Sequence, residues 1–401
     1  MDNLLLVLKQ HGMWGGVLGT LTFIVLGFFA TKKGILTKET NGRITKFLIQ
    51  FALPFLCIAA FMQPANKALA KEIGIVLATS ILFYVLAAVV SAILVKHAPK
   101  LVPKLVTKKA EELLAASGNT GLKGQYREEA IKSIQGKVMT TVIMLSYGSL
   151  QFFAYPLLIA LSGDVTKGAI FDKGSALALA QIWCLPYMIA AFSYVAMQYS
   201  GQKISKATIK PIMKAILHPM MIALYISLFM WALQFAVTTK FGLNFQEDPK
   251  GQQFWQGLHF KAGKIFPTVS KILGFGIGII SPLAWIVIGG SLAASDIKKS
   301  MANKSVWIVS VLRLTLMPLI AFLIAVLLVS TKLVSVSTGT MLTLLGATPP
   351  AAVCIMFAVA NKHEHTTFTA EVSALSTLLS VFAMPVWIVI ANVALKAIAG
   401  V

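Results

Sequence analysis

Ten long apolar runs dominate this chain of 401 residues and constrain its fold more than any other feature. A helix needs about 20 consecutive apolar residues to cross the hydrocarbon core of a bilayer. Lipid offers no water to backbone N–H and C=O groups, so such a run must pair them internally, as a helix does. We therefore predict an all-α membrane protein with ten transmembrane helices, near residues 12–31, 42–62, 72–96, 138–162, 175–199, 211–237, 265–293, 305–330, 338–360 and 367–397.

The composition excludes an ordinary soluble domain. Hydrophobic residues make up 57% of the chain and charged residues 12%, which is about half the charged fraction of a typical soluble domain. The first residues lack the charged segment and cleavage site of a secretory signal, so the first apolar run is expected to stay as a helix. The three cysteines, Cys57, Cys184 and Cys354, lie in apolar runs and indicate buried small side chains without disulfide or metal spacing.

The basic residues predict the orientation of the chain. The 35 Lys and Arg exceed the 14 acids, and 22 of these bases lie in the connections that follow odd-numbered runs, against 12 on the other side. Cytoplasmic connections carry such an excess, so both termini are predicted outside, in the plasma membrane. We favour this insertion signal over steering of anionic substrates, although a positive field also attracts anions. Nucleic acid is not an expected partner.

Two connections are longer than the others. Residues 97–137 combine many lysines with "EELL" and "REEA", and we prefer a solvated basic linker over a cytoplasmic amphipathic helix. Residues 238–264 interleave aromatic and polar residues, which is typical of a stretch lying in the outer membrane interface.

Matched prolines indicate that the chain has two related halves. Pro186 in the fifth run matches Pro385 in the tenth, an offset of 199, and Pro156 in the fourth matches Pro349 in the ninth, an offset of 193. Five spans in each half give the second half the opposite orientation. The pattern predicts a 5+5 inverted repeat, an architecture of secondary transporters. Pro350 has no counterpart in the fourth run.

The broken fourth and ninth helices are the predicted substrate site. A break frees backbone N–H groups and the positive end of the second half-helix, which together bind an anion without a buried Lys or Arg. Polar side chains in a membrane face a protein interior, and several gather at the breaks. The predicted substrate-binding residues are Ser149, Gln151, Pro156, Thr348, Pro349, Pro350, Gln50 and Arg313.

The charged residues inside the runs are few. The sequence places no Asp or Glu in the middle of a run, which argues for a uniporter or exchanger over coupling to protons or sodium. Arg313 lies about two turns inside the eighth run, and either snorkelling to the interface or pairing with a substrate carboxylate explains it. "HEH" at 363–365 indicates a solvated turn, so no metal or cofactor is expected.

At these motifs the sequence resembles the auxin efflux carrier family, which includes plant auxin carriers and bacterial malate and malonate permeases. The resemblance rests on "GILTKETNGRITKFLIQFALPFLCIAAF", "SPLAWIVIGGSLA", "VLRLTLMPLIA", "TPPAAVCIMFA" and "TLLSVFAMPVWIVI", and it covers nearly the whole chain. It implies the bile acid symporter fold, in which helices four and nine are broken and cross at the substrate site. Where many members have Asn and Gly before the helix-four proline, this chain has Ser149, Gln151 and Ala154.

The resemblance also implies a division into scaffold and transport units. Helices 1–2 and 6–7 form the scaffold, through which a homodimer is possible, and helices 3–5 and 8–10 form the transport domain. The corresponding residues are 1–71 and 201–304 for the scaffold and 72–200 and 305–401 for the transport domain.

We therefore expect a transporter of small organic anions, with a dicarboxylate such as malate or malonate preferred, working by elevator-type alternating access. The alternative is efflux of monocarboxylates or indole-acid-like anions, which need one anion locus and an apolar pocket. An enzyme is disfavoured, because the chain lacks a buried acidic pair, a metal-binding helix motif and a nucleophile elbow. A receptor or channel would not need the inverted repeat.

Overall fold

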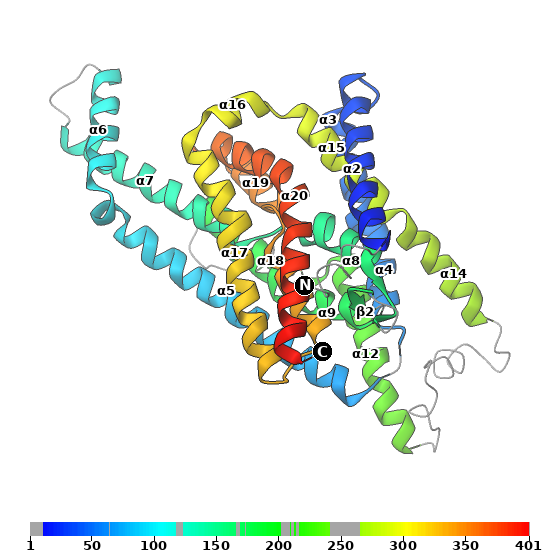
Figure 1. The fold of residues 1–401 in the computed structure, drawn as a ribbon. Helices are drawn as coiled ribbons and strands as arrows, with labels where there is room; N and C mark the ends of the chain where they lie inside the picture. The colour runs from blue at the N-terminus through cyan, green and yellow to red at the C-terminus, as the bar shows by residue number, and fades with distance from the viewer. Residues whose placement is uncertain are drawn as a thin grey trace.

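The computed structural model describes residues 11–63, 65–117, 123–165, 169–172, 174–201, 209, 212–213, 216–240 and 265–400. This part of the chain is almost entirely helical, as Figure 1 shows. Six of its helical stretches are long and apolar enough to cross a membrane: Glu39–Ala60, Lys67–Leu101, Ser175–Ser200, Lys271–Ala294, Lys304–Ser330 and Thr366–Ala399. Four shorter apolar stretches accompany them: Leu18–Lys32, Leu150–Leu161, Pro219–Phe235 and Val336–Gly346. An all-α membrane protein is therefore confirmed, and each of the ten stretches overlaps one of the apolar runs.

One group of helices packs around the pair α2 and α15. It comprises α2 (His11–Lys32), α3 (Lys38–Phe47), the π-helical turn η1 (Leu48–Ala52), α4 (Leu53–Ala60), α12 (Pro219–Lys240), α14 (Ile265–Gly278) and α15 (Ile280–Ala294). Glycines let α2 and α15 approach at backbone distance, since a Cβ at Gly289 would lie 1.9 Å from the carbonyl oxygen of Ile24. Small residues at such a crossing are the usual basis of close packing between membrane helices.

A second group is built from two similar sets of three helices. The first set is α5 (Lys67–Leu101), α7 (Lys123–Ser146) and α9 (Ser175–Ala190), in which α5 packs against the other two. The second set is α17 (Lys304–Ser330), α18 (Val336–Gly346) and α20 (Thr366–Ala399), which pack against one another. Pro186 lies inside α9 and Pro385 inside α20, so the two prolines matched in the sequence occupy corresponding helices.

The remaining elements complete these sets. The turn η3 (Leu150–Ala154) continues into α8 (Tyr155–Leu161), α19 (Ala352–Ala360) follows α18, and η5 (Ala191–Val195) with α10 (Ala196–Ser200) extends α9. The short helix α16 (Ile297–Ala302) links α15 to α17. Two-residue strands, β1 (Ser162–Gly163) and β2 (Phe171–Asp172), pair in parallel beside the end of α8.

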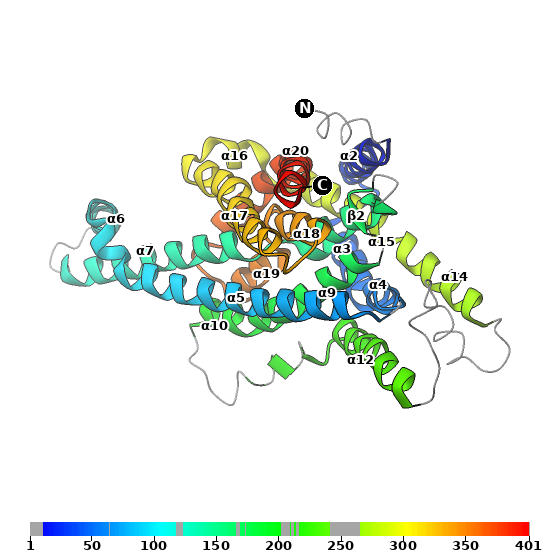
Figure 2. The same cartoon turned by 60° about the horizontal axis from the view of Figure 1, so that its bottom comes forward.

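The connection 97–137 is not the solvated linker that we preferred. The helix α5 continues to Leu101, α6 (Pro103–Ser117) follows, and α7 begins at Lys123, so the segment forms a helical hairpin beside the bundle (Figure 2). Buried Val106 lies in α6, which packs against α7, while Leu101 and Leu105 stay exposed, and the amphipathic-helix alternative describes this segment better. For the second long connection, 238–264, residues 241–264 lie outside the described part of the chain.

Candidate functional site: the crossing of two broken helices

The two broken helices meet through their backbones. The helix α7 ends at Ser146 and α18 ends at Gly346, and after each the chain runs extended. These extended segments pair antiparallel at Gly148 and Pro350. The N–H of Ser149 donates to the carbonyl of Pro349 over 2.8 Å, and the N–H of Ala351 donates to the carbonyl of Tyr147 over 2.9 Å. The breaks therefore satisfy each other's backbone groups, as a membrane interior requires.

This pairing explains why the break in the ninth run tolerates a second proline, at position 350. The two hydrogen bonds belong to the residues on either side of Pro350, which sits opposite Gly148. At such a non-hydrogen-bonded position of an antiparallel pair, the residue's own N–H points away from the partner strand. Proline lacks that N–H, so Pro350 removes no bond from the bridge.

Arg313 binds at the C-terminal ends of α7 and α18, the helices that precede the two breaks (the first half-helices). Its side chain is 2% exposed and donates from Nη1 to the carbonyl of Leu145 in α7. Its Nε donates to the carbonyl of Thr348 over 2.7 Å, just beyond α18, and Nη2 donates to Oγ1 of the same residue over 3.1 Å. Each helix C-terminus carries about half a negative charge, so one guanidinium balances the two ends. Arg313 is therefore buried and does not snorkel to the interface, and its observed partners are backbone carbonyls and a hydroxyl group.

The N-terminal ends of the helical segments that follow the breaks, η3 and α19, have no side-chain cap, although the N–H of Leu150 donates to the carbonyl of Gly148 over 3.0 Å. The residue before η3 is Ser149 and the residue before α19 is Ala351, and neither provides a side-chain cap. Ser149 and Ala352 line a cavity, and Ala352 is exposed there. The first N–H groups of a helix lack acceptors within the helix, and each N-terminus carries about half a positive charge. The two ends together offer about one positive charge to a ligand in the cavity.

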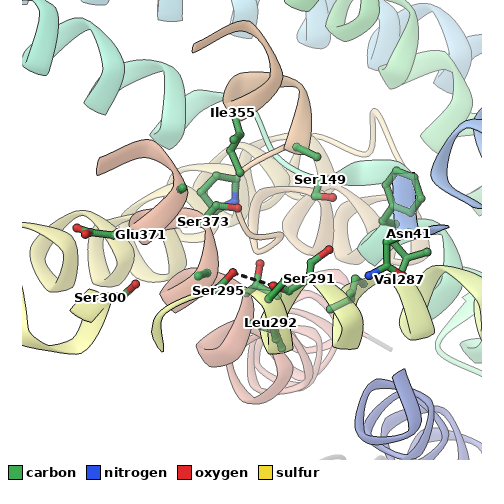
Figure 3. Close-up of a pocket in the computed structure, with 18 of the residues that line it drawn as sticks. Asn41, Ser149, Val287, Ser291, Leu292, Ser295, Ser300, Ile355, Glu371 and Ser373 are labelled. Atoms are coloured by element: carbon green, nitrogen blue, oxygen red, sulfur yellow. Dashed lines mark hydrogen bonds between the residues drawn. The ribbon is translucent and has the colours of Figure 1, made fainter. Parts of the chain in front are cut away.

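The cavity has a volume of about 600 Å³ and lies between the two groups of helices. One wall comes from α3 and α15, the other from η3, α19 and α20. Figure 3 shows Ser149 on one side of it, Ser291 and Leu292 of α15 on the other, and Glu371 and Asn41 towards opposite ends. The remaining lining is mostly apolar or hydroxylated, including Phe152, Phe153, Val287, Ile288, Ile355, Ser373 and Thr377.

The charged residues of the cavity lie away from the crossing. Asp296 caps α16, Lys299 is an exposed residue of α16, and Glu371 of α20 accepts a hydrogen bond from the Asn303 side chain over 3.1 Å. The part of the cavity at the breaks is lined by neutral groups. Among the described residues, no cluster of three His, Cys, Asp or Glu could hold a metal ion.

Only some of the predicted site residues line the cavity. Ser149 and Pro350 line the cavity, and Pro349 provides the carbonyl that binds Ser149. Pro156 is buried in α8, which continues from η3, so it lies beyond the break at residues 147–149 and not at it as predicted. Thr348 is fully buried on the side of Arg313 and is absent from the cavity lining.

The two glutamines lie elsewhere. Gln151 directs its Nε2 towards the sulfur atoms of Met188 and Met220, at 3.5 and 3.3 Å. Gln50 has an exposed side chain in η1 and does not line the cavity. Their nearness in sequence to a proline placed them in the predicted site, but the structure points them away from it.

Asn41 is the residue that sequence reasoning missed. It lies in α3, is 5% exposed, lines the cavity, and its Oδ1 is buried without a hydrogen-bond partner. It packs against Gly290 of α15, where a Cβ would lie 2.1 Å from Nδ2. In the sequence Asn41 belongs to the polar stretch "TKETNGR" and resembles a loop residue. A buried acceptor without a partner is costly, so Oδ1 marks a place for a hydrogen-bond donor such as a water or a ligand hydroxyl group, while Nδ2 is the atom that can donate to an anion.

The comparison with protein families agrees with this architecture. The family model described as "Membrane transport protein" matches residues 14–124 and 134–388, which is nearly the whole chain. The chain belongs to this family. It is the auxin efflux carrier family that the sequence motifs resemble. No curated protein matches the chain. Family membership makes the protein a membrane transporter, and an enzymatic role has no support from it.

Proposed function

We propose that this member of the family transports small organic anions whose carboxylate binds at the crossing. The observation that carries the proposal is the pair of uncapped half-helix N-termini, at Ser149 and Ala351, beside a cavity of about 600 Å³. A carboxylate placed there receives backbone N–H groups and about one unit of compensating charge in a setting of low dielectric constant. These N–H groups can bind the carboxylate without a buried cation. Arg313 binds the carbonyls of Leu145 and Thr348 instead.

The first candidate substrate is a short dicarboxylate such as malate or malonate. We propose that its second carboxylate binds elsewhere than at Arg313, whose hydrogen bonds to Leu145 and Thr348 already use three of its donors. The second carboxylate would instead receive hydrogen bonds from Asn41 and from the hydroxyl groups of Ser291 and Ser373 on the cavity walls. These neutral donors compensate a second negative charge less well than a cation does.

A monocarboxylate is the second candidate, and a specific observation favours it. The cavity offers one positively polarised locus, and much of the remaining lining is apolar, from Phe152, Phe153, Val287 and Ile355 among others. An indole-acid-like anion would place its carboxylate at the crossing and its ring against these side chains. Such pockets, apolar with a few polar groups, are the usual form of small-molecule sites.

We further propose ten transmembrane spans in a 5+5 inverted repeat, with both termini outside the plasma membrane. The scaffold would comprise 1–71 and 201–304, and the transport domain 72–200 and 305–401. The matched sets α5–α7–α9 and α17–α18–α20 support the repeat, as do the two breaks that pair with each other. A homodimer would form through the scaffold helices.

The cavity suggests which way this conformation faces. It borders α16 and the first turn of α20, next to the connections in which Lys and Arg are most frequent. The positive-inside bias puts those connections in the cytoplasm. The described conformation would therefore be open to the cytoplasm, and an elevator movement of the transport domain against α3 and α15 would carry the crossing to the other side.

Counterflow in liposomes tests the proposal. Purified protein is reconstituted with an unlabelled acid inside, and uptake of the labelled acid is followed for malate, malonate and a panel of monocarboxylates. A transporter gives saturable uptake that exceeds equilibrium transiently, and a channel does not. If no organic acid is taken up by protein that is folded and inserted, the proposed function is wrong.

A further inference from the structure

We propose that Arg313 is a positioning residue, a resident cation that holds the two breaks in register from the side opposite the cavity. The substrate would meet the N-terminal ends of the second half-helices, while Arg313 binds the C-terminal ends of the first ones. It therefore acts on the substrate through the backbone of the crossing, without touching it.

The contacts of Arg313 join two segments that are distant in sequence. One guanidinium reaches Leu145, two residues before the first break begins, and Thr348 within the second break. The two residues of the antiparallel bridge follow these contacts closely in sequence, since Gly148 is three residues after Leu145 and Pro350 is two residues after Thr348. A planar fork with five donors suits this task, because it fixes the direction of each carbonyl as well as its distance.

The surroundings are fitted to the guanidinium. A Cβ at Gly148 would lie 2.3 Å from Nη2 of Arg313 and 2.2 Å from Oγ1 of Thr348, so only glycine leaves this space. Behind the crossing, Arg313, Gly148 and Tyr84 line a void of about 20 Å³, which is separate from the substrate cavity. Such a volume holds about one water molecule and excludes an organic acid.

Charge balance also assigns Arg313 to the C-terminal ends. A buried cation without a partner is very costly, and no carboxylate among the described residues forms an ion pair with Arg313. Two helix C-termini provide about one unit of negative charge, which matches one guanidinium. Three of the five N–H donors of Arg313 already bind Leu145 and Thr348, and Arg313 does not line the substrate cavity.

Transport kinetics can separate a positioning residue from a direct ligand and from a residue needed only for folding. The variants are Arg313→Lys, which keeps the charge and loses the fork, and Thr348→Val, which removes the hydroxyl acceptor. We expect KM to rise about tenfold for each variant, which corresponds to the loss of one charge-assisted hydrogen bond. The factor should be similar for malonate and for a transported monocarboxylate. Thr343→Val is the control, since its buried hydroxyl bonds only within α18.

Two kinetic results would overturn the inference. A KM that rises for malonate alone would make Arg313 a ligand of the second carboxylate. An unchanged KM, with only less folded protein, would make it a packing residue. The double variant Arg313→Lys with Thr348→Val should be no more than about twofold worse than the poorer single variant, because both changes break one contact. Effects that multiply would also contradict the inference.

Hydrogen exchange tests the same inference without any transported substrate. This test therefore remains valid even if the proposed function is wrong. In the full-length protein in detergent, peptides covering Ser149 and Ala351 should exchange faster in Arg313→Lys than in the wild type. The control is Arg43→Lys, an exposed residue paired with Glu39. Equal exchange of these peptides in the wild type and in Arg313→Lys would contradict the positioning role.

Discussion

Replacing Gly148 by Ala places one methyl group in the contact that holds the crossing together. The new Cβ would lie 2.2 Å from Thr348 Oγ1 and 2.3 Å from Arg313 Nη2, whereas ordinary contacts begin at 3.4 Å. To reach an ordinary contact, Oγ1 must move by 3.4 minus 2.2, or 1.2 Å, and Nη2 by 3.4 minus 2.3, or 1.1 Å. We expect these shifts to break the hydrogen bond of 3.1 Å between Nη2 and Oγ1.

The expected magnitude follows from the lost bonds. The loss of one charge-assisted hydrogen bond gives a cost of about 1.5–3 kcal/mol. If the cost falls on the binding-competent arrangement, transport at low substrate concentration drops at least about tenfold. Counterflow and thermal melting of the purified variant measure both effects.

The matched control is Gly74→Ala in α5, where no heavy atom lies within 4 Å of the new Cβ. Alanine is a better helix former than glycine, so this variant should melt no lower than the wild type. A Gly148→Ala protein that melts and transports like the wild type would refute the reasoning, because the contact between Arg313 and Thr348 would then be dispensable.

Three further predictions concern the rest of the account. Gly289→Ala should lower the yield and melting temperature of the folded protein, because its Cβ would lie 1.9 Å from the backbone of Ile24. Gly278→Ala is the control, since its Cβ meets open space, and equal melting temperatures of the two variants would contradict the prediction. Asn41→Ala should raise KM about three- to tenfold in counterflow, with Gln50→Ala as the unaffected control, and the reverse pattern would return the site to η1. Replacing Na⁺ by choline should leave uptake unchanged, since the runs contain no central carboxylate; uptake that requires Na⁺ would show that a cation is coupled after all.

Several features of the fold could be predicted from the sequence because their causes are local. A run of about 20 apolar residues and a mid-run proline act on their own segment, so the sequence predicts the apolar spans and the break at Pro349–Pro350. In the fourth run the proline misplaces the break, which lies at residues 147–149, before Pro156. The preferred prediction of a solvated linker at 97–137 was wrong because it rested on the high charge density of the segment. The packing of α6 against α7, which stabilises the helices there, is a tertiary contact.

The contacts within the site depend on segments far apart in the chain, and the sequence does not show them. Arg313 lies 168 residues from Leu145 and binds its carbonyl, a backbone group that carries no sequence signal. Asn41 faces the cavity only because α3 packs on α15. Gln151 is one turn short of Pro156, yet it points to methionine sulfur atoms, because the π-helical turn η3 changes the direction of its side chain.

The location of the carboxylate at the crossing is most directly tested by substrate protection of a cysteine introduced at Ala352. This residue is exposed in the cavity at the first turn of α19, while native Cys57, Cys184 and Cys354 are buried and give little background. The measurement is the rate at which a membrane-impermeant maleimide labels Ala352→Cys from the cytoplasmic side of inside-out vesicles. We predict that labelling slows as a transported acid is added, with half-protection near its KM. A labelling rate that no transported acid changes would contradict the account.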